Sequence, residues 1–382
     1  MDYRIFAKEH YNITALDSRE ISDPVVGLKE FLVGKSEESL KQDVQDLLIA
    51  VFEENGWRKH GTPINLYRKT KDVAKLMDFV WLIVSCLDRE LVKPANVEKH
   101  YLYRQYQQRT FSRLFHNTPR KVEGKTVSAV ALAKAIFDRR FGLLLKDDLA
   151  EVWLNVSFNA SYMRNLTTDF HCIESSTDVQ DYRYLFAIID GAFELAEQPE
   201  LRCRAEALAY YQLFATDADH PDVLFKETIE DPIGCFEGPF FYVDAARFPD
   251  AIRTWYSLIF QTGHWVNHSD PGNILYVREV VQRFLETGWL LLRVGFPKQG
   301  LSVMKRKYIK DLSALEVADP IAYVRHCFER HRLHEWKHLL EVWLCQSLSD
   351  EDHVDAAVTE QDCESIVKLM QALHLIRHRA IA

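Results

Sequence analysis

Apolar residues recur at the spacing of an α-helix along most of the chain, and this pattern constrains the fold more than any other feature. From residue 40 they fall at i, i+4, i+7, i+8, i+11 and i+12, with acidic residues between them, as Leu40, Val44, Leu47, Leu48, Val51 and Phe52. Such a stretch predicts a helix with one buried face. Comparable patterns predict further helices at about 70–91, 96–116, 127–143, 147–163, 177–196, 199–215, 247–262, 272–293, 320–331, 332–348 and 359–378. The sequence therefore predicts an all-α protein.

Strand signals are confined to one stretch, at about 230–245, where glycine and proline residues interrupt an aromatic run. That composition is typical of a short hairpin or, as we favour here, of a long ordered loop. The loop divides the predicted helices into two groups. The expected architecture is a multi-helix array or two packed helical subdomains, with an N-terminal helical region at 1–229, a connecting loop at 230–250 and a C-terminal helical region at 251–382.

The composition indicates a globular protein of the cytoplasm. A chain of 382 residues with 47% hydrophobic content can bury a large core. Its 47 basic and 56 acidic residues give a net charge of -9, which argues against a protein that is basic overall but leaves room for a local basic patch. The seven cysteines stand singly and are odd in number, so neither a disulfide framework nor a CxxC metal ribbon is indicated, and a reducing compartment fits them best.

No segment of the sequence is expected to enter a membrane. The N-terminal stretch MDYRIFAKEHYN carries charges from its second residue and lacks the apolar core of a secretory signal. The longest apolar run, Phe79 to Leu87, is far shorter than the roughly 20 residues that cross a bilayer. This run predicts a helix buried on all sides, and no membrane partner is expected.

The segment RLHEWKHLLEVW, residues 332–343, contains the His-Glu-x-x-His spacing of the zinc-binding helix of many metallopeptidases. On a helix, His334 and His338 lie one turn apart and can reach a single ion, while Glu335 can activate a bound water. A third ligand would come from Glu360 or Glu364 on the last predicted helix. These residues are the candidate zinc site of a hydrolase.

Two features of the sequence favour a structural role for the same segment. Zinc-binding helices of this kind normally carry uncharged residues between the glutamate and the second histidine, whereas this chain has Trp336-Lys337. They also pack under a sheet, whereas residues 300–331 have the pattern of helix and loop. The preferred interpretation is an amphipathic helix without a cofactor, in which the histidines lie beside or outside a buried stripe made of Leu333, Leu340 and Trp343.

The segment at 100–121 contains no acidic residue, although the chain as a whole is negatively charged. On a helix, Arg109, Arg113 and His116 fall on one face, and the two phenylalanines of the segment fall on the opposite face. The aromatic residues would anchor such a helix, and its cations would bind phosphates or an acidic protein surface. A solvated or internally paired face is the alternative. The predicted binding face consists of Arg104, Arg109, Arg113, His116, Arg120 and Lys121.

The pair Arg109 and His116 also matches the Arg-x(4–6)-His pattern of helical ribonucleases of the HEPN class, in which the two side chains do acid/base work on RNA at a dimer interface. At a separation of seven residues, the two side chains lie about 20° apart on a helix. Three other matches occur in the chain, so the pattern specifies little. It makes Arg109 and His116 the candidate catalytic residues, with Glu335 as a weaker candidate.

The leading functional hypothesis is an interaction or scaffold subunit of a protein assembly, with the 100–121 face as its binding surface. An HEPN-like ribonuclease or nucleic-acid-binding subunit is the main alternative, and a zinc-dependent hydrolase is the second. Two acidic segments of the form [S/T]-D-x-D-H-x-D, at 216–222 and 349–355, are interpreted as turns between helices in preference to cation sites.

Overall fold

The structure is a computed structural model, and it describes residues 13, 15–52, 56–87, 121–122, 125–126, 130, 133–134, 137, 182–199, 201–216, 219–224, 226–232, 245–261, 271–300, 302–350 and 358–381. The all-α prediction is confirmed, because regular structure in these ranges is helical except for one small hairpin. In the hairpin, β1 (Lys121–Val122) pairs antiparallel with β2 (Lys125–Thr126). Residues 233–244, for which the sequence predicts a hairpin or loop, lie outside the described residues.

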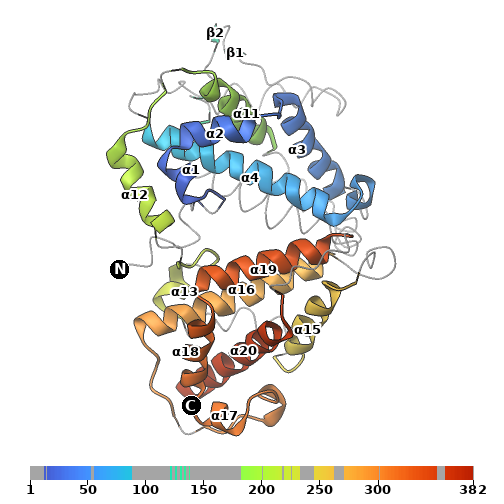
Figure 1. Cartoon of the computed structure of the whole chain (residues 1–382), viewed down its shortest axis with the longest axis vertical. Helices are drawn as coiled ribbons and strands as arrows, with labels where there is room; N and C mark the ends of the chain where they lie inside the picture. Colours follow the sequence, from blue (N-terminus) through green and yellow to red (C-terminus); the bar gives the residue numbers. More distant parts are fainter. Residues whose placement is uncertain are drawn as a thin grey trace. The chain divides into compact units, whose positions relative to one another are not determined.

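The chain divides into two compact units, Ile13–Asp217 and Ala218–Ala382, so the division precedes the connecting loop predicted at 230–250. The first unit is built around the long helix α4 (Pro63–Cys86), shown in light blue in Figure 1. The helices that pack against it are α2 (Pro24–Leu32), α3 (Glu37–Phe52), α11 (Tyr182–Ala196) and α12 (Ala205–Thr216). Shorter elements complete the unit, namely α1 (Ser18–Ser22) and the 3-10 helix η2 (Gly56–His60).

The apolar run at the end of α4 explains why this helix is central. Phe79, Leu82 and Cys86 are completely buried, whereas Trp81 and Ser85 are half-buried. The prediction of a helix buried on all sides is therefore correct for most of the run but wrong at Trp81 and Ser85, which form a partly exposed edge. Cys86 packs as an apolar residue, and burial raises the pKa of its thiol to about 11.

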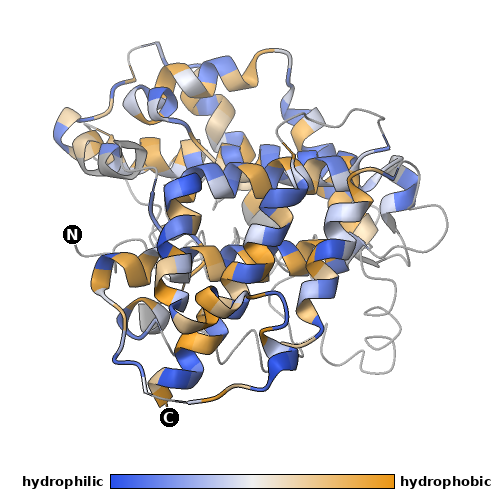
Figure 2. Cartoon of the chain, turned by 60° about the horizontal axis from the view of Figure 1, so that its bottom comes forward, coloured by the Kyte–Doolittle hydropathy of each residue, from blue (hydrophilic) through white to orange (hydrophobic). Residues whose placement is uncertain are grey.

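The second unit is built around α16 (Pro271–Val294), which contacts four other long helices. These are α15 (Phe248–Leu258), α18 (Pro320–Arg330), α19 (Leu333–Leu348) and α20 (Glu360–Ile381). Short helices join them, namely α13 (Lys226–Glu230), the 3-10 helix η8 (Arg306–Tyr308) and α17 (Ala314–Ala318). Figure 2 shows apolar and hydrophilic residues alternating along the same helices, as expected for helices with one buried face.

Close packing in the second unit depends on small and aromatic side chains. A Cβ atom on Gly288 of α16 would lie 3.2 Å from the Phe328 ring, so the glycine lets α18 approach α16. The rings of Trp255 and Trp343 meet edge to face with centroids 5.4 Å apart. None of the helices in the described part of the chain combines the length and the hydropathy that crossing a bilayer requires.

Candidate functional site

The His-Glu-x-x-His segment forms the first turns of α19, and its apolar residues belong to the core. Leu333, Leu340 and Trp343 are completely buried, which confirms the predicted stripe. Trp336 is also completely buried, and its indole N–H donates to a backbone carbonyl at 3.3 Å, that of Cys327. The histidines lie outside the stripe, as predicted, since His334 is half-buried and His338 is exposed.

The polar residues of the segment stabilise the start of α19. His334 donates twice to one carboxylate oxygen of Asp219, from its backbone N–H at 2.9 Å and from ring Nδ1 at 2.8 Å. The Glu335 carboxylate accepts from the backbone N–H of Arg332 at 2.6 Å. Because the first N–H groups of a helix lack intrahelical partners, both carboxylates act as caps. Glu335 therefore has a structural partner of its own.

Lys337 connects α19 to the acidic segment at 216–222. Its ammonium group lies 2.6 Å from the Asp222 carboxylate and also donates to the backbone carbonyl of His220. The His220 ring contacts the other Asp222 oxygen at 2.9 Å. Burial favours the neutral form of Asp222, but Lys337 and His220 outweigh it and lower the pKa of this carboxyl. Burial also opposes the charged form of His220, and the Asp222 carboxylate outweighs that effect and raises the pKa of the imidazole.

Lys337 also approaches a second acid, Glu286 of α16. The Glu286 side chain is completely buried, and its carboxylate lies 3.7 Å from the lysine ammonium. It accepts hydrogen bonds from the Gln282 side chain at 2.8 Å and from the backbone N–H of Val223 at 2.9 Å. Burial raises the pKa of Glu286, and the neighbouring Asp222 adds to this shift while Lys337 opposes it. Lys337 is therefore shared between two acids in a buried polar cluster.

The acidic segment at 216–222 has a structural role in this arrangement. Asp219 caps α19 and Asp222 pairs with Lys337, so the segment is fixed to the same helix that contains His-Glu-x-x-His. Thr216 is the last residue of α12, and the described residues 219–222 form no regular element, as the interpretation of a turn requires. Most of the matching segment at 349–355 lies outside the described residues.

The remaining zinc-ligand candidates have other surroundings in the structure. Glu360 is exposed at the start of α20. Glu364 makes a two-pronged ion pair with Arg253, at 2.7 Å to Nε and 2.8 Å to a terminal nitrogen. Within the ranges that the structure describes, no three His, Cys, Asp or Glu side chains converge on a point that could hold a metal ion.

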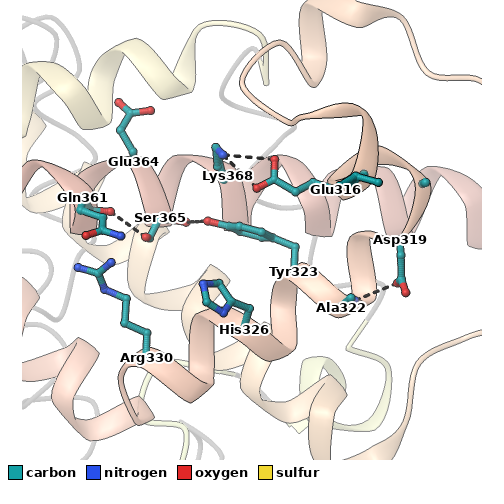
Figure 3. Close-up of a pocket in the computed structure, with 12 residues that line it drawn as sticks. Glu316, Asp319, Ala322, Tyr323, His326, Arg330, Gln361, Glu364, Ser365 and Lys368 are labelled. Atoms are coloured by element: carbon teal, nitrogen blue, oxygen red, sulfur yellow. Dashed lines mark hydrogen bonds and ion pairs between the residues drawn. The ribbon is translucent and has the colours of Figure 1, made fainter.

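A groove of about 660 Å³ lies on the second unit between α17, α18 and α20, as Figure 3 shows. Its apolar lining comes from Ala318, Ala322 and the Tyr323 ring, and Leu315 stands at its rim with 83% of its surface exposed. The Tyr323 hydroxyl donates to the backbone carbonyl of Ser365 on α20 at 3.4 Å, which fixes the ring across the groove. Burial raises the pKa of this phenol, so it stays protonated as a donor.

Two helix caps position the groove. Ser313 and Glu316 form a capping box at the start of α17, and the Glu316 carboxylate also binds Lys368 of α20. Asp319 ends α17 and caps α18, where it accepts from the backbone N–H of Ala322 at 2.9 Å. Asp319 and Pro320 therefore cap the start of α18, and they set the turn between the two helices.

Most charged residues that line the groove are paired within the protein. The pairs are Glu316 with Lys368 (3.0 Å), Arg330 with Asp362 (2.8 Å) and Glu364 with Arg253 (2.7 Å). His326 is exposed and lies 3.9 Å from Glu329, at the limit of an ion pair. The groove therefore has little unbalanced charge, and its lining surface is mainly apolar.

The predicted binding face at 100–121 lies outside the described residues up to Arg120. The structure describes only the backbone of Lys121, which pairs with Thr126 in the hairpin. Arg109 and His116, the candidate catalytic pair, are among the residues that are not described. The binding face and the catalytic role of its Arg109/His116 pair remain predictions from the sequence.

The groove could not be predicted from the sequence, although local signals for its walls exist. The pattern Ser-x-x-Glu at 313–316 is a capping box that indicates the start of α17, and Asp-Pro at 319–320 indicates the start of α18. The sequence does not show that α20 lies beside both helices.

Comparison with known proteins identifies no relative, since no protein-family model, no curated protein and no solved structure matches the chain.

Proposed function

We propose that the chain is an interaction subunit of a protein assembly, and that the groove between α17, α18 and α20 receives an uncharged, apolar segment of a protein partner. The supporting observation is an exposed apolar residue, Leu315, at the rim of a groove whose main charges are already paired. Exposed apolar surface beside a hollow is typical of binding sites.

The pairing of charges favours an uncharged occupant. A charged ligand would compete with ion pairs that Glu316, Arg330 and Glu364 already make inside the protein. An uncharged segment replaces only water on apolar atoms, and removal of that water is favourable. The groove volume lies within the range of about 300–1,000 Å³ that is usual for binding pockets.

The position of Leu315 favours a protein segment over a small molecule. A small molecule held within the groove would leave this side chain largely in water, whereas a helix or extended segment can cover both the groove and its rim. Gln361 and Ser365 of α20 add polar groups beside the apolar lining, which suits the backbone of a bound segment.

The first test places a charge in the groove. Ala322→Glu should reduce the amount of the bound protein partner by about tenfold or more, because it buries a carboxylate against the incoming apolar segment. The fold should be unaffected, since an acid in the first turn of α18 is favourable there. The measurement is the quantity of each protein retained by the tagged chain, determined by mass spectrometry.

Ala205→Glu is the matched control, because Ala205 is an exposed first-turn residue of α12. This variant should retain the partner at the wild-type level. Equal loss in both variants, or equal retention in both, would show that the groove is not the binding site. A small molecule retained by the wild-type chain and lost in Ala322→Glu would assign the groove to a ligand of a different class.

A second contact is predicted from the sequence at the 100–121 face. Arg109→Glu with Arg113→Glu should weaken binding of an acidic protein or a nucleic acid by about tenfold or more, because reversing two charges changes the local charge by four units. Surface changes of this kind cost little stability, so the melting temperature should stay within a few degrees of the wild type. Unfolding of the double variant would instead identify these arginines as internal ion-pair partners.

A further inference from the structure

Two segments of the second unit lack acidic residues, and the structure brings them together. Residues 293–310 contain six basic residues and no acid, and residues 369–382 contain two basic residues, two histidines and no acid. The backbone N–H of Gly300 donates to the carbonyl of Arg379 at 2.8 Å. The rings of Tyr308 and His374 lie with their centroids 5.8 Å apart. The two segments form one surface, here called the basic end, with Lys298, Lys305, Arg306, Lys307, Arg377 and Arg379.

The outermost cations of the basic end are not neutralised by the described residues. Lys298, Lys305 and Lys307 are exposed, and no carboxylate in the described ranges makes an ion pair with them. The acids that follow them in sequence have other partners, since Asp311 pairs with Arg253 and Glu316 pairs with Lys368. This part of an acidic protein therefore has a positive local field.

His374 lies inside the basic end, half-buried and close to two further cations. Burial, followed by the charges of Arg377 and His378, lowers the pKa of His374 to about 4. The ring is therefore neutral near pH 7. A favourable interaction with the helix dipole accounts for basic residues in the last turn of α20, but it does not account for the lysines of the segment before α17.

Exposed aliphatic side chains accompany these cations. Val303 is 95% exposed and precedes Lys305 by two residues, and Ile381 is 65% exposed one turn after Arg377 on α20. In an extended segment, residues two apart point to the same side, so Val303 and Lys305 share a face. Figure 2, in which this end of the unit comes forward, shows hydrophilic and apolar residues side by side next to the chain's C-terminus.

We propose that the basic end binds the surface of an anionic lipid bilayer, with the lysines on lipid phosphates and Val303 and Ile381 inserted among the headgroups. Protruding aliphatic residues among basic ones are typical of peripheral membrane contacts. Such a contact needs no segment that spans the bilayer. The sequence-based expectation of no membrane partner depends only on the length of the apolar runs, so it does not bear on a surface contact. The proposed lipid contact is independent of the groove.

The same observations disfavour a nucleic acid as the partner. A phosphate backbone would bind the cations but would leave Val303 and Ile381 in water. The Tyr308 ring is covered by the ammonium of Lys307, 4.6 Å from its centroid, and by His374 at its edge, so it does not offer a free face to a base.

The test is co-sedimentation of the full chain with vesicles. Wild type should bind vesicles of phosphatidylcholine with about 30% phosphatidylserine, should not bind pure phosphatidylcholine, and should dissociate as salt rises. Lys305→Glu with Lys307→Glu should weaken binding about twentyfold or more. Val303→Ser should weaken it about fivefold without changing the charge. Lys29→Glu with Arg325→Glu, the same change of charge at exposed helix positions elsewhere, should bind like wild type.

Three results would overturn the proposal. The first is that the wild-type chain does not bind the anionic vesicles. The second is that wild type and the Lys305/Lys307 variant bind them equally well. The third is that the chain binds a single-stranded oligonucleotide more tightly than the vesicles, and that Val303→Ser does not change its affinity for the oligonucleotide. The Ala322→Glu variant should bind vesicles like wild type, so failure of this proposal and failure of the groove proposal can be told apart.

Discussion

Replacement of Lys337 by methionine should lower the free energy of unfolding by about 3–5 kcal/mol, because it leaves the completely buried Glu286 and the half-buried Asp222 without their cation. Asp222 and Glu286 both face this ammonium group, and the Glu286 side chain is completely buried. Methionine has a side chain of similar length, so the loss of stability measures the missing charge more than a change in packing. Urea unfolding followed by tryptophan fluorescence measures it, since Trp255, Trp336 and Trp343 lie in the same unit.

Lys368→Met is the matched control for Lys337. Lys368 pairs with Glu316 near the surface, where 29% of the lysine side chain and 19% of the glutamate side chain are exposed. Removal of such a pair should cost at most about 1 kcal/mol. Equal effects of the two substitutions would mean that the cluster around Lys337 is solvated and does not hold the 219–224 segment on α16 and α19.

Trp336→Ala should cost about 3–5 kcal/mol, because it removes a large buried side chain from within the His-Glu-x-x-His segment. It also leaves the carbonyl of Cys327 without its indole donor. In contrast, the double change His334→Ala and His338→Ala should cost about 1 kcal/mol, since it removes one partly exposed contact with Asp219 and one exposed ring.

Thermal unfolding and elemental analysis of the same samples separate the two interpretations of this segment. If the segment is structural, the double histidine variant keeps its activity in the partner-retention assay and its metal content matches that of the wild type. If it is a zinc site, that variant loses both bound zinc and function, and Trp336→Ala is no longer the more damaging change.

Long helices could be predicted from the sequence because their pattern repeats over several turns. The predicted bounds of α16, α18 and α19 agree with the structure to within one residue. Short helices could not be predicted in this way, because a helical period is recognised only when it repeats over several turns. Both α1 and α17 have five residues, and each is fixed by a capping box, with Asp17 and Glu20 in the first case and Ser313 and Glu316 in the second.

Contacts between distant residues account for the rest of what the sequence did not show. Lys337 and Asp222 are 115 positions apart, and no local pattern announces their ion pair. Lys337 nevertheless stood out in the sequence as a charged residue where a zinc helix normally has an uncharged one. The structure supplies its role, which is to bind the acidic segment that was predicted separately as a turn. The groove likewise exists only because α20 packs beside α17 and α18.

Hydrogen exchange of the partner-bound chain tests the central claim most directly. We expect binding to slow exchange at the backbone amides of α17, because this short helix contains the exposed Leu315 and its amides should exchange readily in the free chain. The amides at the start of α18 beside Ala322 should slow with them, and those of α2 and α12 should not change. Slower exchange confined to α2 and α12, with α17 unchanged, would contradict the assignment of the groove as the binding site.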